Sequence, residues 1–210
     1  MPENISIVSF LITSLIAYLL GSISFALIFS NLIYKEDIRK YGSKNAGATN
    51  MMRTYGWQIA LLTLLGDALK GVIAVIIGNA ICGSEVGGYL AGLFCIIGHI
   101  LPVFAKFKGG KGVATGAGIV LILNPVIFFI MLIILVGTVT ITKFVSLGSC
   151  LAALVFSVLT IVCQLNSNNN IFIILCSIIM SAIIIWKHRT NIKRLLSGTE
   201  SKISFKKKDN

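Results

Sequence analysis

Acidic residues are scarce in this sequence, and charged residues of either sign are few. Only seven of the 210 residues are Asp or Glu, against 18 Lys and Arg, so that charged residues make up 12% of the chain. Hydrophobic residues make up 56%, and the mean hydropathy is +0.94. Because soluble domains carry about 25% charged residues, this composition excludes an ordinary soluble domain.

Cysteine and carboxylate chemistry are also poorly represented. The five cysteines occur singly, mostly within apolar runs and without a CxxC pair, at Cys82, Cys95, Cys150, Cys163 and Cys176. This spacing argues against a disulfide framework, a thiol nucleophile and a His/Cys zinc site. The polar loops offer no convincing pair of carboxylates, which excludes carboxylate-pair catalysis. We therefore expect no metal and no cofactor.

Long apolar runs decide the class of the protein. They lie near residues 5–33, 57–79, 87–105 and 113–186, and runs of about 18 or more apolar residues indicate membrane-spanning helices. The last run is too long for one helix, and it is divided at Asn124-Pro125, at Lys143 and at the polar stretch 164–170. We predict an all-α polytopic membrane protein with seven transmembrane helices, near residues 5–33, 57–79, 87–105, 113–123, 125–142, 145–163 and 171–186.

Basic residues lie almost entirely between the apolar runs, in loops at about 35–56, 106–112 and 187–210. This distribution follows the positive-inside rule. With seven spans, the three loops and Lys143 share the cytoplasmic face, the N-terminus is outside and the C-terminus is cytoplasmic. A single kinked helix over 113–142 would place Lys143 and the C-terminal basic segment on the opposite face of the membrane. We therefore expect one integral-membrane domain over 1–210, a monomer in the lipid bilayer, with no nucleic-acid partner.

The stretch Lys106–Gly118 is basic and dense in glycine. Gly109, Gly110 and Gly112 flank Lys111, and successive N–H groups in such a turn can form a concave anion-binding nest. A helix starting directly after this turn would add an N-terminus that attracts anions. The stretch is not a nucleotide-binding P-loop, because a glycine follows the lysine where that motif needs Ser or Thr. The alternative interpretation is a flexible, positively charged loop between two membrane helices.

Three ionisable residues fall inside predicted spans. Asp67 and Lys70 are three residues apart, on one face of the helix over 57–79. Charges at that depth are costly unless they are paired or face a polar cavity. They are either functional residues or a mutually neutralising pair that locks helix packing. His99, in a largely apolar helix, is either a structural histidine or part of the wall of a site.

Three polar motifs carry a resemblance to a known family. They are Gly42–Asn50 with Arg53, Gly98–Phe104 continued by Phe107–Thr115, and His188–Leu195 followed by Gly198, Glu200 and Lys202. In this order they resemble the motifs of the PlsY family, the acyl-phosphate:glycerol-3-phosphate acyltransferases of bacterial membranes. Gly66–Gly71 also resembles a family element. The chain departs from the family pattern at Lys44, where Gly is usual, and at Ala46 and Ser24, where Pro is usual.

The resemblance implies a seven-span enzyme of the bacterial inner cell membrane with its active site on the cytoplasmic face. Its substrates would be acyl phosphate and glycerol 3-phosphate. Such an enzyme transfers a fatty acyl group to the 1-hydroxyl of sn-glycerol 3-phosphate, which gives 1-acyl-sn-glycerol 3-phosphate and inorganic phosphate for phospholipid biosynthesis. Two phosphate groups in one site bring roughly three to four negative charges, which the basic, acid-poor loops would balance.

The motif positions imply three sets of site residues. The catalytic set is Ser43, Arg53, Lys111, His188 and Asn191. The substrate-binding set is Asn45, Gly47, Thr49, Asn50, Gly109, Gly110, Gly112 and Thr115. The supporting set is Asp67, Lys70, His99 and Glu200. His188 is a candidate general base oriented by Asn191, while the departing phosphate is the alternative proton acceptor. A Ser43 acyl-enzyme is a weaker alternative, and Glu200 is expected to anchor the basic tail.

Two other functions fit the basic loops. A transporter or channel for a phosphate-bearing anion would also gather basic residues and half-helices around its ligand. Its polar groups would lie near the middle of the bilayer, however, whereas here they gather at one face. A lipid-binding module would need the basic clusters but not the Asn and His residues at motif spacing.

Overall fold

The structure is a computed structural model that describes residues 5–167 and 169–203. The basic run Lys206–Lys208 is outside the described residues. Within them the regular secondary structure is entirely helical, which confirms the all-α class. The elements are α1 (Ile7–Ser22), α2 (Phe25–Tyr34), η1 (Ile38–Lys40), α3 (Ala48–Tyr55), α4 (Trp57–Cys82), α5 (Glu85–Ile100), η2 (Val103–Ala105), α6 (Val113–Leu123), α7 (Pro125–Thr142), α8 (Val145–Leu165), α9 (Ile171–Lys187) and α10 (Arg189–Leu196).

Each of the seven predicted apolar stretches is helical, although not all have the length of a membrane span. Among the described residues, five stretches are long and apolar enough to cross a bilayer: Ile7–Tyr34, Trp57–Cys82, Glu85–Ala105, Pro125–Thr142 and Val145–Leu165. Helices α9 and α10 together make a sixth, bent by 56°. Helix α6 is apolar but has only 11 residues. The total of seven spans therefore stays a prediction, as does their orientation.

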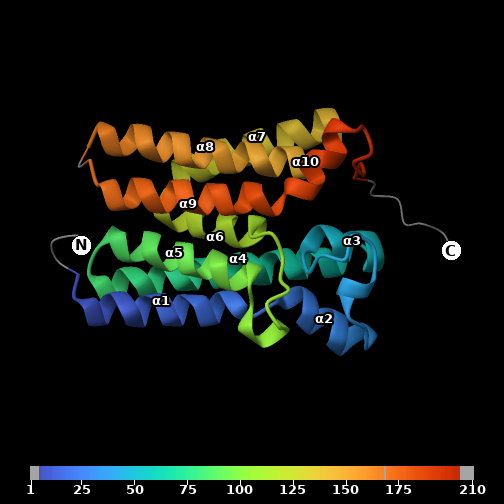
Figure 1. The fold of residues 1–210 in the computed structure, drawn as a ribbon, viewed down its shortest axis with the longest axis horizontal. Coiled ribbons are helices and arrows are strands. Elements are labelled where there is room, and N and C mark those ends of the chain that lie inside the picture. Colours follow the sequence, from blue (N-terminus) through green and yellow to red (C-terminus); the bar gives the residue numbers. More distant parts are fainter. Residues whose placement is uncertain (1–4, 168, 204–210) are drawn as a thin grey trace.

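Helix α5 lies at the centre of the bundle and α7 at its edge. Figure 1 shows α1, α4 and α5 on one side, α7, α8 and α9 on the other, and α6 between them. Twelve of the 16 residues of α5 are buried, against only Ile127 of the 18 in α7. A helix that is apolar all round is normally buried. The exposed apolar surface of α7 is therefore consistent with contact to lipid.

Small residues allow α1 and α5 to approach closely. A Cβ atom added to Gly21 of α1 would overlap the carbonyl of Cys95, and one added to Gly98 of α5 would overlap the carbonyl of Tyr18. Close packing of this kind drives helix association in membranes, where apolar burial between helices gains nothing over contact with lipid. The glycines thus fix the distance between α1 and α5, and the second polar loop follows the end of α5.

A buried lysine stabilises the break between α1 and α2. The ammonium of Lys70 donates to the backbone carbonyls of Gly21 and Ile23, at 2.9 and 2.6 Å, where the helical hydrogen-bond pattern stops. It also lies 3.0 Å from a carboxylate oxygen of Asp67 and 2.9 Å from Nδ1 of His99. All three ionisable side chains are at most 5% exposed. The charges inside the membrane are therefore paired and joined to the fold of α1.

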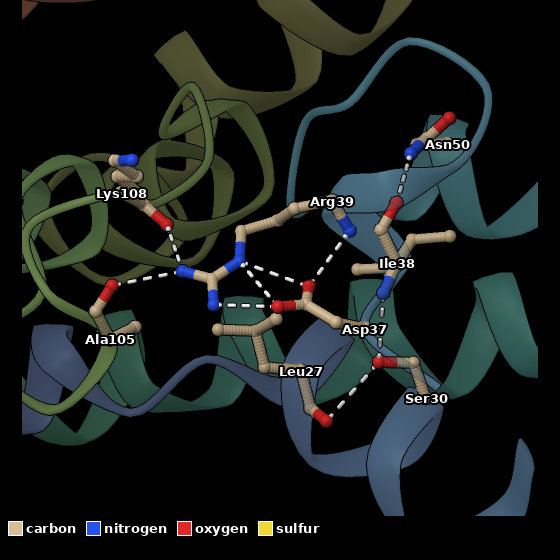
Figure 2. A network of polar contacts seen from close by, with 8 residues as sticks. All are labelled: Leu27, Ser30, Asp37, Ile38, Arg39, Asn50, Ala105 and Lys108. Atoms are coloured by element: carbon tan, nitrogen blue, oxygen red, sulfur yellow. Dashed lines mark hydrogen bonds and ion pairs between the residues drawn. The ribbon is translucent and has the colours of Figure 1, made fainter. Parts of the chain in front are cut away.

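An arginine joins the first two polar loops, as Figure 2 shows. The guanidinium of Arg39 donates to both carboxylate oxygens of Asp37, at 2.7 to 3.1 Å, and its Nη1 donates to the carbonyls of Ala105 and Lys108, at 2.9 and 3.3 Å. The hydrogen bond from this arginine holds the pKa of Asp37 below its ordinary value. Such a charge-assisted fork is rigid as well as strong. It fixes the loop before α3 against the loop before α6.

We expect the substitution Lys70→Met to destabilise the protein by about 3–5 kcal/mol, because it leaves the buried Asp67 carboxylate without a partner. Thermal or denaturant unfolding in detergent micelles measures this loss. The double variant Asp67→Asn/Lys70→Met is the matched control and should be more stable than the single variant. A Lys70→Met protein with the unfolding midpoint of the unsubstituted chain would contradict this account.

Candidate active site

A cavity of about 440 Å³ is lined by all three polar loops. Its polar residues are Ser43, Asn45, Thr49, Asn50, Arg53, Asp67, His99, Lys111, Ser146, Ser149, His188, Asn191 and Glu200, and Gly47 also lines it. Its apolar walls come from three helices and include Leu64, Leu65, Val72, Leu121, Phe128, Leu132 and Leu135. The cavity can therefore accept a polar group and a hydrocarbon chain together.

Four helices begin at this cavity. The starts of α3 at Gly47–Thr49, of α6 at Gly112–Ala114, of α8 at Val145–Ser146 and of α10 at His188–Asn191 all contribute lining residues. None of the four has a side chain that caps its first N–H groups. Free N–H groups and the positive end of the helix dipole both favour an anion. The backbone itself therefore makes the polar part of the cavity electropositive.

Lys111 is held by a chain of hydrogen bonds that runs along one side of the cavity. Its Nζ donates to Oδ1 of Asn191, and Nδ2 of Asn191 donates to Oε1 of Glu200 at 2.6 Å. Ser146 and Arg194 also donate to Glu200, each at 2.8 Å. Burial, opposed by the charge of Glu200 and supported by that of Arg194, lowers the pKa of Lys111 to about 8. The chain fixes the position of the ammonium group.

Glu200 connects the C-terminal segment to the site, as expected for a residue that anchors the tail. Burial raises the pKa of its carboxyl, but hydrogen bonds from Asn191, Arg194 and Ser146 outweigh that effect and keep it below the ordinary value. Glu200 is therefore an anion already matched by donors. The other carboxylate in the lining, Asp67, is paired with Lys70. Neither carboxylate cancels the charge of Lys111 through a direct ion pair.

His188 is oriented by the backbone and not by Asn191. Its Nδ1 lies 2.9 Å from the carbonyl oxygen of Ile184, and because a carbonyl only accepts, Nδ1 carries the proton. The other ring nitrogen, Nε2, is then the acceptor. Burial, with the nearby charge of Lys111, lowers the pKa of His188 to about 4. The expected pairing of His188 with Asn191 is thus corrected, since the Asn191 amide is shared between Lys111 and Glu200.

In the first loop, Asn50 lines the cavity and also has a structural task. Its side-chain oxygen accepts from the N–H of Ser43 at 2.8 Å, and its Nδ2 donates to the carbonyls of Ile38 and Tyr41, at 3.3 and 3.1 Å. These bonds use the amide to shape the loop. Ser43 is exposed and lines the cavity. Arg53 is also exposed, and its Nη2 donates to the carbonyl of Ser201 at 3.3 Å.

Two of the glycines expected to form the anion nest are bound to backbone carbonyls at the end of α5. The N–H groups of Gly109 and Gly110 donate to the carbonyls of Ile100 and His99, at 3.3 and 3.1 Å. A Cβ atom at Gly110 would overlap Nε2 of His99, so this glycine allows the loop to pack on that ring. Gly109 and Gly110 do not line the cavity among its described residues, and neither does Thr115, whose hydroxyl lies 3.2 Å from His99. Lys111 and the start of α6 face the cavity in their place.

Two serines of α8, Ser146 and Ser149, line the cavity and were not among the predicted site residues. A signal for them exists in the sequence, because they are three residues apart at the start of a helix and directly follow the break at Lys143. Serine is common in membrane helices, however, and this chain has many. Only the packing of α8 beside the polar loops distinguishes these two.

The fold and the cavity together define a helical integral-membrane protein with a cavity that is electropositive at one part and apolar at another. The sequence profile of the family described as Glycerol-3-phosphate acyltransferase matches residues 11–198. The chain belongs to this family, which confirms the resemblance seen in the three motifs.

Curated relatives and solved structures agree with this assignment. Glycerol-3-phosphate acyltransferases of Finegoldia magna and of Thermoanaerobacter sp. (strain X514) are 43% and 45% identical to this chain over 196 and 195 residues. These matches cover 92% and 93% of this chain and 96% of each relative. The crystal structure of PlsY, an integral membrane glycerol 3-phosphate acyltransferase, in its glycerol 3-phosphate form has a TM-score of 0.84 and 34% identity, and covers 93% of this chain and 96% of that one. Its lysophosphatidic acid form has a TM-score of 0.79 and 32% identity over 94% of this chain.

The environment of Lys111 leads to a test that needs no substrate. We expect this amine to react with an acylating reagent with a midpoint near pH 8, because burial favours its neutral, nucleophilic form. Labelling across a pH series, read by mass spectrometry of peptides, measures the midpoint, with exposed Lys193 as the internal reference for the reagent. A midpoint for Lys111 near 10.5, the ordinary value, would contradict the buried environment described above.

Proposed function

We propose that the protein transfers a fatty acyl group from acyl phosphate to the 1-hydroxyl of sn-glycerol 3-phosphate, giving 1-acyl-sn-glycerol 3-phosphate and inorganic phosphate. One observation carries this proposal: a single cavity combines apolar walls with four uncapped helix starts and Lys111. The apolar walls suit the acyl chain. The helix starts and the cations suit the two phosphate groups, which bring roughly three to four negative charges.

The proposed topology has seven spans, an outside N-terminus and a cytoplasmic active site in the inner membrane of a bacterium, all within one domain over 1–210. The basic loops support it, because α2, α3 and α10 lie at the same end of the bundle, opposite the start of α1 (Figure 1). Helix α6, at about 1.5 Å per residue, is shorter than the hydrocarbon layer of about 30 Å. Its buried residues, which include Ile119 and Val120, show that protein and not lipid surrounds much of it.

The cavity offers two groups of phosphate ligands. Lys111 and the N–H groups at the start of α6 form one group, and Ser43, Thr49 and Arg53 form the other. Arginine binds phosphate with two parallel hydrogen bonds, and lysine acts as a compact charge. Two separate groups are what the reaction needs, because the acceptor keeps its phosphate while the donor loses one. The developing oxyanion on the acyl carbon would be stabilised by the same donors.

The chemical step needs a proton acceptor. The 1-hydroxyl attacks the acyl carbon, the new C–O bond forms, the C–O bond to phosphate breaks, and one proton must leave the hydroxyl. His188 is a weak base with a pKa of about 4, whereas the oxygen that leaves with the phosphate gains negative charge as its bond to carbon breaks and becomes the stronger base. We therefore assign the proton to the departing phosphate, and His188 takes no part in the proton transfer.

The donor is tested directly with purified protein. With acyl phosphate and glycerol 3-phosphate we expect release of phosphate together with lysophosphatidate, and with acyl-CoA at the same concentration we expect no product. Phosphate release and thin-layer chromatography of the lipid measure the two outcomes. Equal turnover with acyl-CoA would exclude acyl-phosphate specificity. Anion uptake into liposomes without acyl transfer would favour a transporter.

Proton transfer to the departing phosphate leads to a second test. If the departing phosphate takes the proton, His188 is not the general base. We therefore expect His188→Ala to lower kcat by less than about tenfold, whereas loss of a general base typically lowers it 10²–10⁴-fold. Steady-state kinetics with both substrates varied separate kcat from KM, and detergent gel filtration confirms folding. Asn191→Ala is the comparison, since it frees Lys111 and should act mainly on substrate KM. A kcat loss of 10² or more in folded His188→Ala would assign the base role to the histidine.

A further inference from the structure

A second hollow, of about 550 Å³, lies between the first and second polar loops. We call it the basic groove, because six of its lining side chains are cationic and only one is acidic. Its residues are Asp37, Arg39, Lys40, Lys44, Asn45, Lys106, Phe107, Lys108, Gly109 and Lys187. The acyltransferase chemistry proposed above uses none of its lysines.

The single carboxylate of the basic groove is already neutralised. Asp37 is paired with Arg39 at 2.7 Å, and Nη1 of this arginine donates to the carbonyls of Ala105 and Lys108 (Figure 2). Most donors of Arg39 are therefore used within the protein, and its charge is matched by Asp37. The five lysines remain, and within residues 5–167 and 169–203 none of them forms an ion pair with a carboxylate.

The basic groove differs from the reaction cavity in what it can hold. Phe107 is its only large apolar residue, whereas the cavity has apolar walls from α4, α6 and α7. An acyl chain would find no wall here, so the lining suits a small, hydrophilic anion. Among the described residues the two hollows share one side chain, that of Asn45. The groove is therefore adjacent to the cavity without being part of it.

The backbone around the basic groove is held in an unusual conformation. Of the six non-glycine residues with positive φ in the described part of the chain, three line the groove: Lys44, Lys106 and Phe107, at 58°, 55° and 58°. Side chains other than glycine seldom adopt this region, and such residues gather at ligand-binding sites. Hydrogen bonds hold them there, for example from the N–H of Phe107 to the carbonyl of Pro102 at 2.9 Å.

We propose that the basic groove is a second anion site, which captures a water-soluble phosphate monoester, glycerol 3-phosphate, before it passes Asn45 into the reaction cavity. The proposal rests on the proposed function only for its acceptor and not for its acyl donor. A cleft lined by charges of one sign raises the local concentration of its ligand and the rate of association. Because four of the five lysines, Lys40, Lys44, Lys106 and Lys108, are exposed, this effect is screened by salt.

Lys44→Gly is the main test, because glycine adopts positive φ without strain and only the charge is lost. Lys35→Gly is the matched control, since Lys35 is exposed with φ of 57° but lies outside the groove. At low ionic strength we expect Lys44→Gly combined with Lys108→Gln to lower kcat/KM for glycerol 3-phosphate about five- to tenfold, with kcat within about twofold. In about 0.5 M salt the difference should vanish. Lys35→Gly should match the unsubstituted enzyme in both conditions.

Three results would overturn the proposal. They are a fall in kcat without a change in kcat/KM, an equal effect of Lys35→Gly, and a loss that does not depend on salt. Assays in nanodiscs of zwitterionic and of anionic lipid separate the two sources of phosphate. If the loss occurs only with anionic lipid, a lipid head group occupies the groove and capture of glycerol 3-phosphate is wrong.

A direct binding measurement tests the basic groove independently of which acyl donor the protein uses. Calorimetric titration of the intact protein with glycerol 3-phosphate, without any acyl donor, should show weaker binding in the Lys44→Gly/Lys108→Gln variant than in Lys35→Gly. That result supports the groove even if acyl phosphate proves to be the wrong donor. Unchanged binding and unchanged kcat/KM in the double variant would reject the groove while leaving acyl-phosphate chemistry intact.

Discussion

An anion held at the edge of a hydrocarbon layer loses water, so the protein must supply donors in its place. Four helices do this here, because α3, α6, α8 and α10 all begin at one cavity without a capping side chain. Lys111 adds a full charge at a position fixed by Asn191 and Glu200. Helices α6 and α8 therefore both begin at this cavity, where the segments that precede them reach it.

The cations of the protein divide into those that hold the fold and those left for ligands. Lys70 binds the carbonyls at the break between α1 and α2, Arg39 joins the first two loops, and Arg194 holds Glu200. Their charges are matched by carboxylates within the protein. Lys111 and Arg53 have no such carboxylate partner among the described residues, and both line the cavity. Net positive charge alone therefore does not show where an anion binds.

Two neighbouring hollows of the protein have different linings. The reaction cavity has apolar walls, and the basic groove has almost none. The first and second polar loops touch at Ala46 and Gly110, and a Cβ atom at Gly110 would disturb that contact. Gly110 thus matters for the close approach of the two loops, and the N–H groups of Gly109 and Gly110 are bound to backbone carbonyls.

The sequence by itself determined the all-helical membrane class, the helical stretches and the three loops that meet, because apolar length and basic loops are local properties. The motifs also identified the family, and they placed Ser43, Arg53, Lys111, His188 and Asn191 around one cavity. Only the tertiary structure decided the partners within it: Asn191 holds Lys111 and not His188, Asn50 shapes its own loop, and Ser146 joins from α8. Hydrogen-bond partners depend on which segments pack together, and in this chain those segments are up to about 150 residues apart, as with Arg53 and Ser201.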